Sequence, residues 1–491
     1  MEDPRDRVLR LEAEIVRLIE EWRQASRLCD SEQSECYISR IPTETLTSIF
    51  VVCVQANEDV QIPAMTSPPM VFLSVCKRWR QIAMRTPALW STFDASIESI
   101  DDVFEMTRWL KLADQHPLSI SLDTGLDQDL ADLAMDVLLE HQSSWSKIHI
   151  HWGPDETAPL LANTFTTKGA PLLQEFKIFT DFYYEGEDDM DGKTDARLGK
   201  LLKYSHQIHT FEWQTGHSIV ANDVSPIHLA GIPFTRLRHL KLDYMMAFDC
   251  CLEVMRRAPL LESCEFTFVG NHCTHNLDQV HLPHLHSLYV RTDRYMEDFL
   301  NGLVLPSLRC IKIEFRATLP YDDVDCEDPD MLPAWPHVAF LSLIQRSSCP
   351  LEELYFVAPI TEDQLIEYLQ ILSPTLTTIT LRGKHGWSNI DHRLLGLLTH
   401  EQAGSDAVLC PNLRKISFDD CSMMLPENSM ADMIQSRVIF TDTSGCNPAF
   451  EVCLVGPENF ICENDWRRLK VLSKRSAGKA NITLKMLPRR V

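Results

Sequence analysis

The 491-residue sequence lacks several patterns by which secreted, membrane and catalytic proteins are recognised. No run of about 18 apolar residues could form a membrane-spanning helix, and the opening residues MEDPRDR contain no apolar signal-peptide core. The 16 cysteines include no C-x-x-C pair, and the motifs GxSxG, HExxH and GxGxxG are absent. We therefore expect an intracellular protein, cytoplasmic and/or nuclear, without membrane contact or disulfides.

Basic residues are too few to balance the acidic ones. The chain has 46 Lys and Arg against 70 Asp and Glu, which gives a net charge of −24. A nucleic-acid backbone would be repelled on average, so nucleic acid is not an expected partner. Apolar residues make up 45% of the chain, which suffices for a large core built from several domains or from one repeat array.

Two local patterns resemble ligand sites without matching them. Residues 186–194 have the glycines and lysine of a phosphate-binding loop, but one residue too many and four acidic side chains that would repel phosphate. As a calcium loop, the same segment has Leu198 where a bidentate carboxylate is needed. The histidines and cysteine of residues 272–286 match no standard zinc-ligand spacing. We expect no catalytic residue, cofactor or metal, and interpret residues 186–194 and 322–330 as solvated acidic insertions.

The first 34 residues carry apolar side chains at alternating spacings of three and four. This pattern predicts an amphipathic helix over residues 5–30. Two roles remain open: self-association as a coiled coil, or packing of a single helix against the segment that follows. The apolar positions are Val8, Leu11, Ile15, Leu18, Trp22, Ala25 and Cys29.

Residues 35–95 contain three short helical patterns. In the first, Pro42 fits the opening turn, and a stripe follows at Leu46, Ile49, Phe50 and Cys53. In the second, the same spacing joins Phe72, Val75, Cys76, Trp79, Ile82 and Ala83, with Lys77, Arg78 and Arg80 on the solvated face. The third begins at Thr86-Pro87 and carries Leu89 and Trp90. Such short helices bury little area alone, so we expect a partner or the rest of the chain to cover them.

These residues resemble an F-box, the motif that joins substrate receptors to the Skp-type linker and cullin scaffold of ubiquitin ligases. The match comprises Ile41-Pro42 with Glu44, Leu46, Ile49 and Phe50, then Val75 to Arg80, then Thr86-Pro87, Leu89 and Trp90. Ile41 replaces the usual Leu, and the gap from Val54 to Pro69 is longer than in compact F-boxes. The resemblance implies docking of the linker through Ile41, Pro42, Leu46, Ile49, Phe50, Val75 and Trp79.

From residue 96 to 430, helical stretches alternate with the pattern apolar-x-x-apolar-x-apolar, which resembles divergent leucine-rich repeats. Several spacings fall within the roughly 20–29 residues of such repeats, although their usual Asn is missing from nearly every copy. The pattern predicts an α/β solenoid with a curved parallel sheet and outer helices, for example over 127–140 and 361–373; a doubly wound α/β domain is the alternative. The copies start at Trp145, Leu173, Ile208, Leu237, Leu261, Leu285, Leu308, Leu351, Leu376 and Leu413.

In each predicted strand, the residue between the last two apolar anchors should face away from the core because side chains alternate. These residues should line the concave face, where mixed charges and tyrosines favour binding of a protein target. They are His149, Lys177, Glu212, Lys241, Glu265, Tyr289, Lys312, Tyr355, Thr380 and Ser417.

Residues 431–491 are predicted to close the array as a C-terminal cap and tail, with a strand at 450–456 and a helix at 466–472. Together with the repeats, the resemblance to an F-box implies a non-catalytic substrate-recognition adaptor of a Skp–cullin–F-box (SCF) type E3 ubiquitin ligase. An interaction scaffold outside any ligase and an enzyme hidden in the repeats are the alternatives.

Overall fold

A computed structural model describes most of the chain. The described residues are 17, 20–21, 37–56, 68–153, 169–180, 202, 204–215, 232–270, 279–292, 295–315, 334–383, 390–399, 409–421, 425–443, 450–456, 461–475 and 480–486. The predicted helix over 5–30 lies largely outside them, residues 186–194 and 322–330 lie wholly outside them, and of residues 272–286 the structure describes 279–286. Among the described residues, no helix is long and apolar enough to cross a membrane.

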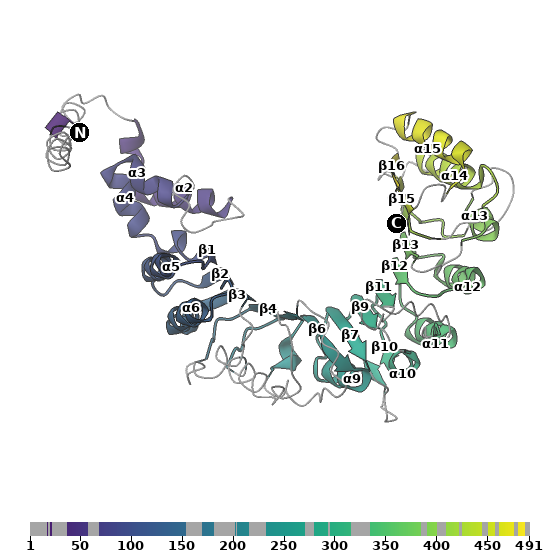
Figure 1. Ribbon diagram of the computed structural model, residues 1–491, viewed down its shortest axis with the longest axis horizontal. Coiled ribbons are helices and arrows are strands. Elements are labelled where there is room, and N and C mark those ends of the chain that lie inside the picture. The colour runs from purple at the N-terminus through teal and green to yellow at the C-terminus, as the bar shows by residue number, and fades with distance from the viewer. Residues whose placement is uncertain are drawn as a thin grey trace, which may run out of the picture.

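One long parallel sheet organises the molecule (Figure 1). Its 14 strands follow one another in sequence order, each hydrogen-bonded to the strand before and after it, apart from β8 and β10. The strands are β1 (Thr92–Ser96), β2 (Leu118–Asp123), β3 (Trp145–Trp152), β4 (Glu175–Thr180), β5 (Thr210–Thr215), β6 (His239–Ala247), β7 (Ser263–Gly270), β9 (Ser287–Thr292), β11 (Cys310–Phe315), β12 (Glu353–Val357), β13 (Thr378–Arg382), β14 (Lys415–Asp419), β15 (Phe450–Gly456) and β16 (Ala480–Met486). The short strands β8 (Val280–His281) and β10 (Leu303–Val304) pair separately.

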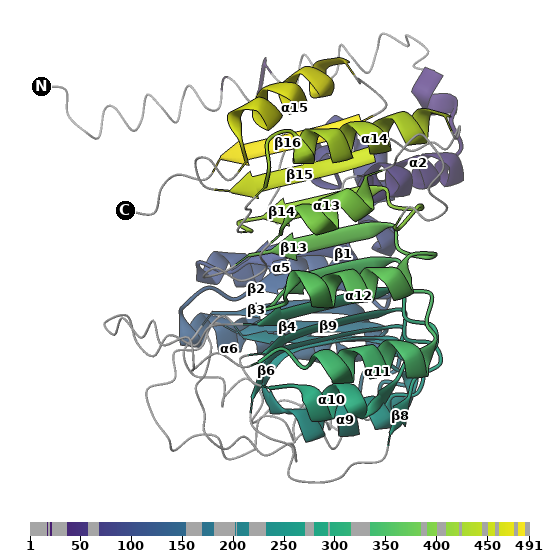
Figure 2. The same ribbon diagram turned by 90° about the vertical axis from the view of Figure 1, so that its right-hand side faces the viewer.

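This strand order excludes the doubly wound alternative, in which the order reverses within the sheet. It is the order of an α/β solenoid-like fold, as predicted, and all ten predicted strand segments are neighbours in the sheet. The sheet curves, with the strands on the inner side of the arc and the helices on the outer side (Figure 1), and helices α11–α15 stack along one end (Figure 2). The helices are α5 (Ile100–Ala113), α6 (Gln128–Glu140), α9 (Phe248–Arg257), α10 (Glu297–Asn301), α11 (His337–Ser347), α12 (Glu362–Leu372), α13 (His392–Leu398), α14 (Ser429–Thr443) and α15 (Glu463–Arg475).

The core lies between the sheet and the outer helices because strand residues alternate between two faces. In β6, Leu240 and Leu242 are buried while Lys241 between them is not. Helix ends follow the local sequence: Asp127 caps α6, and Thr361 with Gln364 forms the predicted capping box of α12. Successive helices are also joined, because the buried guanidinium of Arg437 in α14 donates to the carbonyls of Leu398 and Cys410 at 2.6 and 2.7 Å.

The solenoid extends beyond its predicted limits of 96 and 430. β1 begins at Thr92, before the expected boundary, and α14, β15, α15 and β16 continue the alternation of helix and strand to Met486. The strand expected at 450–456 is β15, and the helix expected at 466–472 lies within α15. The segment after 430 therefore adds two more strands to the sheet, because its apolar residues repeat the buried alternation with less regular spacing.

The segment before the sheet folds as η1 (Tyr37–Arg40), α2 (Thr43–Gln55), α3 (Met70–Val75), α4 (Lys77–Met84) and the single turn η2 (Pro87–Leu89). The continuous helix expected over 72–83 is instead broken at Cys76, whose backbone is extended and whose Sγ caps α4 by accepting from the Trp79 N–H. Trp90 joins this segment to the sheet: its Nε1 donates to the Ala83 carbonyl at 2.8 Å, and its ring meets Trp109 of α5 edge-on.

Candidate functional site: the concave face and the α2–α4 surface

One side chain from each strand forms a continuous line across the concave face, which we call the concave row. Each member is directly paired in register with the next, from β1 to β16. The ten residues predicted for this face are consecutive members of the row. The whole row is Asp94, Ser121, His149, Lys177, Glu212, Lys241, Glu265, Tyr289, Lys312, Tyr355, Thr380, Ser417, Cys453 and Thr483.

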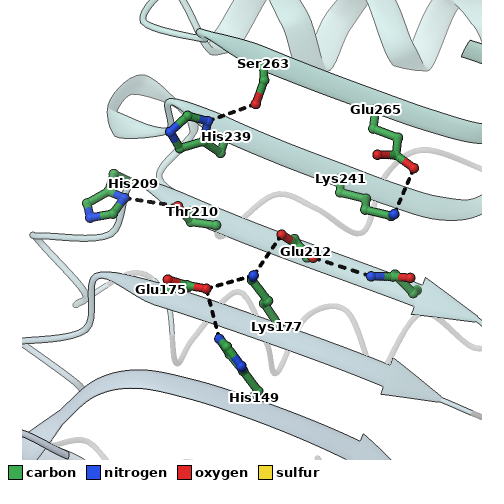
Figure 3. Close-up of polar contacts among 11 residues, drawn as sticks. His149, Glu175, Lys177, His209, Thr210, Glu212, His239, Lys241, Ser263 and Glu265 are labelled. Carbon is green, nitrogen blue, oxygen red and sulfur yellow. Dashed lines mark hydrogen bonds and ion pairs between the residues drawn. The ribbon is translucent and has the colours of Figure 1, made fainter. Parts of the chain in front are cut away.

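Over β3–β7 the charges of the concave row are neutralised by their neighbours (Figure 3). Glu175 accepts from His149 at 2.9 Å and pairs with Lys177 at 2.8 Å. The Lys177 ammonium also lies 3.2 Å from Glu212. Lys241 and Glu265 form a second pair at 2.8 Å. These cations and carboxylates therefore hold the strands to one another and have part of their charge already compensated.

Burial alone would raise the pKa of Glu175, but hydrogen bonds from Lys177 and His149 outweigh it and lower this pKa below its ordinary value. For Lys177, burial would lower the pKa, and the contacts with Glu175 and Glu212 outweigh it and raise this pKa. Both shifts stabilise the ion-paired state of this part of the sheet.

Over β9–β12 the concave row consists of Tyr289, Lys312 and Tyr355, so aromatic side chains replace the ion pairs of β3–β7. Both tyrosines are half-buried, and Lys312 between them is exposed. Tyr289 donates its hydroxyl to Glu314 at 2.8 Å, and the Arg291 guanidinium lies 5.7 Å from the centre of the Tyr289 ring. Burial and the nearby Glu314 carboxylate raise the pKa of Tyr289 well above its ordinary value, so its hydroxyl stays protonated. This stretch combines fixed aromatic rings with an exposed ammonium group.

The last predicted members of the row are small. Thr380 and Ser417 are half-buried, and the neighbouring charges Arg382 and Asp419 are paired at 3.2 Å. Burial and Glu314 raise the pKa of Tyr355, while the Arg382 guanidinium opposes this increase. The polar contacts of this end thus centre on Tyr355 and Arg382.

One pair on the face has the residue types of a hydrolytic site. The His239 ring lies 2.8 Å from the Ser263 hydroxyl (Figure 3). Activation of a serine needs a carboxylate on the far nitrogen of the histidine, and the hydrogen bonds of the described residues include none at His239. Those residues also contain no group of three His, Cys, Asp or Glu able to hold a metal ion.

The α2–α4 segment presents a second surface. Ile49, Val52 and Val75 are 44%, 61% and 53% exposed, and Pro42 is also exposed. Leu46 and Phe50 are buried inside the segment, where Phe50 stacks on Phe72 with ring centres 4.2 Å apart. Ile41 and Trp79 are partly buried against the same core. The seven residues predicted for docking therefore divide into a packed group and an exposed group.

Several residues of this segment differ from expectation. Val52 adds to the exposed apolar surface one turn after Ile49, and the i, i+3 spacing is the signal that would have found it. Cys53 and Cys76, which the helical spacing placed in apolar stripes, are exposed. Arg78 was expected on the solvated face, yet its guanidinium donates to the Ile41 carbonyl at 2.5 Å, a contact over 37 residues that no sequence pattern indicates.

A repeat-like parallel α/β sheet with an open concave face is an architecture suited to binding other proteins. Comparison with known proteins adds no family: the sequence matches no protein-family model and no curated protein. One similar solved structure is that of a protein from Bacteroides fragilis, with 14% sequence identity, coverage of 66% of this chain and 74% of that chain, and a TM-score of 0.32. At these values the similarity bears on neither fold nor function.

Proposed function

We propose that the chain is the substrate-recognition adaptor of an SCF-type E3 ubiquitin ligase. The α2–α4 segment is the F-box that docks a Skp-type linker and, through it, the cullin scaffold. The leucine-rich-repeat-like solenoid holds a protein target on its concave face. The chain itself makes and breaks no bond: it raises the effective concentration of target lysines near the ubiquitin-charged enzyme.

The observation that carries this proposal is the exposed apolar surface of Ile49, Val52 and Val75. It lies on the segment whose sequence resembles an F-box, at one end of the arc and away from most of the concave face (Figure 1). Burial of such side chains by a partner is favourable by about 25 cal/mol per Å². A linker bound there leaves most of the concave row accessible to a target.

The test is capture of a Skp-type linker and cullin by the full chain, compared with the variant Ile49→Asp/Val75→Asp. Both side chains are exposed, so folding should be preserved, while two carboxylates in an apolar interface should weaken capture by about tenfold or more. Val338→Asp on α11, where Val338 is 74% exposed, is the matched control and should capture normally. Phe50→Ala would be a poorer test, because Phe50 is buried and its loss would unfold the segment.

Undiminished capture by Ile49→Asp/Val75→Asp would overturn the assignment of this surface. Absence of linker and cullin from the wild-type complex would favour the second interpretation, in which the same surface and solenoid serve an interaction scaffold outside any ligase.

A further inference from the structure

The cations of the concave row differ in one respect that sequence spacing does not reveal. Lys177 and Lys241 each have a carboxylate in register on a neighbouring strand, at 3.2 and 2.8 Å. Lys312 has tyrosines in register on both sides, Tyr289 on β9 and Tyr355 on β12. Within the described part of the chain, its ammonium makes no ion pair.

The nearest acidic side chain on the same strand is already engaged. Glu314, two residues after Lys312, accepts from the Tyr289 hydroxyl at 2.8 Å and lies 3.4 Å from the Arg291 guanidinium. Asp419 on β14, two residues after Ser417 of the concave row, is paired with Arg382 on β13. The exposed ammonium of Lys312 is thus available for an anion from outside the chain, in a protein whose net charge is −24.

We propose that Tyr289, Lys312 and Tyr355 form an anchor site that binds one Asp or Glu side chain of the target protein, with the neighbouring apolar groups of the target against the two tyrosine rings. The proposal rests on the proposed function in taking the concave face as the target-binding face. Tyrosine rings supply large contact area at low cost in conformational entropy, and Tyr289 is further fixed by Glu314 and Arg291.

The charge of the site favours a carboxylate over a phosphate. A lysine ammonium is a point charge that suits one singly charged group, whereas recognition of a phosphate dianion usually recruits forked guanidinium groups. Here both neighbouring arginines are committed to Glu314 and Asp419, and these carboxylates would repel a second negative charge. The two tyrosines are two strands apart, roughly 10 Å, which is about three residues of an extended segment.

The test is selection of a phage-displayed random peptide library on the full chain. Wild type should enrich peptides with Asp or Glu at one position and apolar residues beside it. Lys312→Glu, an exposed substitution, should lose this preference and select Lys or Arg at that position. Lys111→Glu on the outer helix α5 is the matched control and should give the wild-type motif. A synthetic copy of an enriched peptide should lose about tenfold in affinity when its Glu is replaced by Gln.

Three results would overturn the anchor site: no specific enrichment, an acidic motif that persists in Lys312→Glu, or tighter binding when phosphoserine replaces the Glu. Linker capture is measured on the same proteins and reports separately on the ligase proposal. Lys312→Glu should still capture the linker, because β11, the strand that contains Lys312, lies on the opposite arm of the arc from α2–α4 (Figure 1). If wild type fails to capture the linker but keeps the acidic preference, the ligase proposal fails and the anchor site stands.

Discussion

At the scale of single residues, the concave face contains two kinds of charged side chain. Glu175, Lys177 and Glu212 satisfy one another across β4 and β5, so their contribution is to the stability of the sheet. Lys312 has tyrosines and no carboxylate in register beside it, so under our proposal its charge remains for a carboxylate of the target. The same residue type therefore has two roles, decided by what the adjacent strand places opposite it.

The pH dependence of stability should report the first role. The folded-state pKa of Glu175 lies below the ordinary value of 4.5, so its carboxylate stabilises the fold above pH 4.5, and this stabilisation is lost as the pH falls through the lowered pKa. Glu175→Gln should lower the free energy of unfolding near neutral pH by about 1 kcal/mol or less, since the network is partly solvated. The difference should shrink below pH 4.5. Thermal unfolding across pH measures it.

Glu463→Gln is the control, because Glu463 is 78% exposed and is paired with Arg467 of its own helix, α15. It should change the unfolding temperature little at any pH. A Glu175→Gln difference that grows as the solution is acidified would contradict the assigned sign.

At the scale of elements, the α2–α4 segment depends on the first strand for its stability. Its own interior is small, comprising Leu46, Phe50, Val54, Phe72, Ile82 and Ala83, and Trp90 connects this interior to Trp109 of α5. Three short helices rarely stand alone, and the sheet edge at β1 supplies the missing support. The exposed apolar surface of α2–α4 is thereby held by the solenoid.

Trp90→Ala should therefore loosen α2–α4 more than it loosens the sheet. Loss of a buried Trp costs about 3–5 kcal/mol, and we expect faster amide hydrogen exchange in α2–α4 than in β11–β14. Trp90→Phe keeps most of the ring volume and loses the bond to Ala83, so its cost should be smaller, about 1–3 kcal/mol. Equal loss of amide protection in α2–α4 and in β11–β14 would show that the effect of Trp90 is not confined to the α2–α4 segment.

At the scale of the whole molecule, the described strands of the sheet are hydrogen-bonded in sequence order, so stability should be approximately a sum over adjacent repeats. Removal of residues 461–491 deletes α15 and β16 and leaves β15 as the edge. It also removes the buried Asp465, whose carboxylate accepts from the Ala431 N–H of α14 at 2.8 Å. Hydrogen exchange should accelerate in α14 and β15 and stay unchanged in β1–β7. Loss of protection in β1–β7 would show that the sheet unfolds as one cooperative body.

The sequence by itself determined which strand residues face the core and which form the concave row. Strand side chains alternate with a period of two, so position within a strand fixes the face without knowledge of any neighbour. The capping box at Thr361 and Gln364 and the order of the repeats could also be predicted from the sequence. These properties depend on residues a few positions apart.

Only the tertiary structure decided which of those residues are already paired with other side chains of the protein. The pairing of Glu175 with His149, the isolation of Lys312 between two tyrosines, and the bond from Arg78 to Ile41 join residues about 23 to 43 positions apart. The break at Cys76 and the exposure of Val75 beside it likewise depart from the local helical pattern. Such contacts depend on strand register and on helix packing. The loops between the strands vary in length, so the sequence alone does not specify either of these.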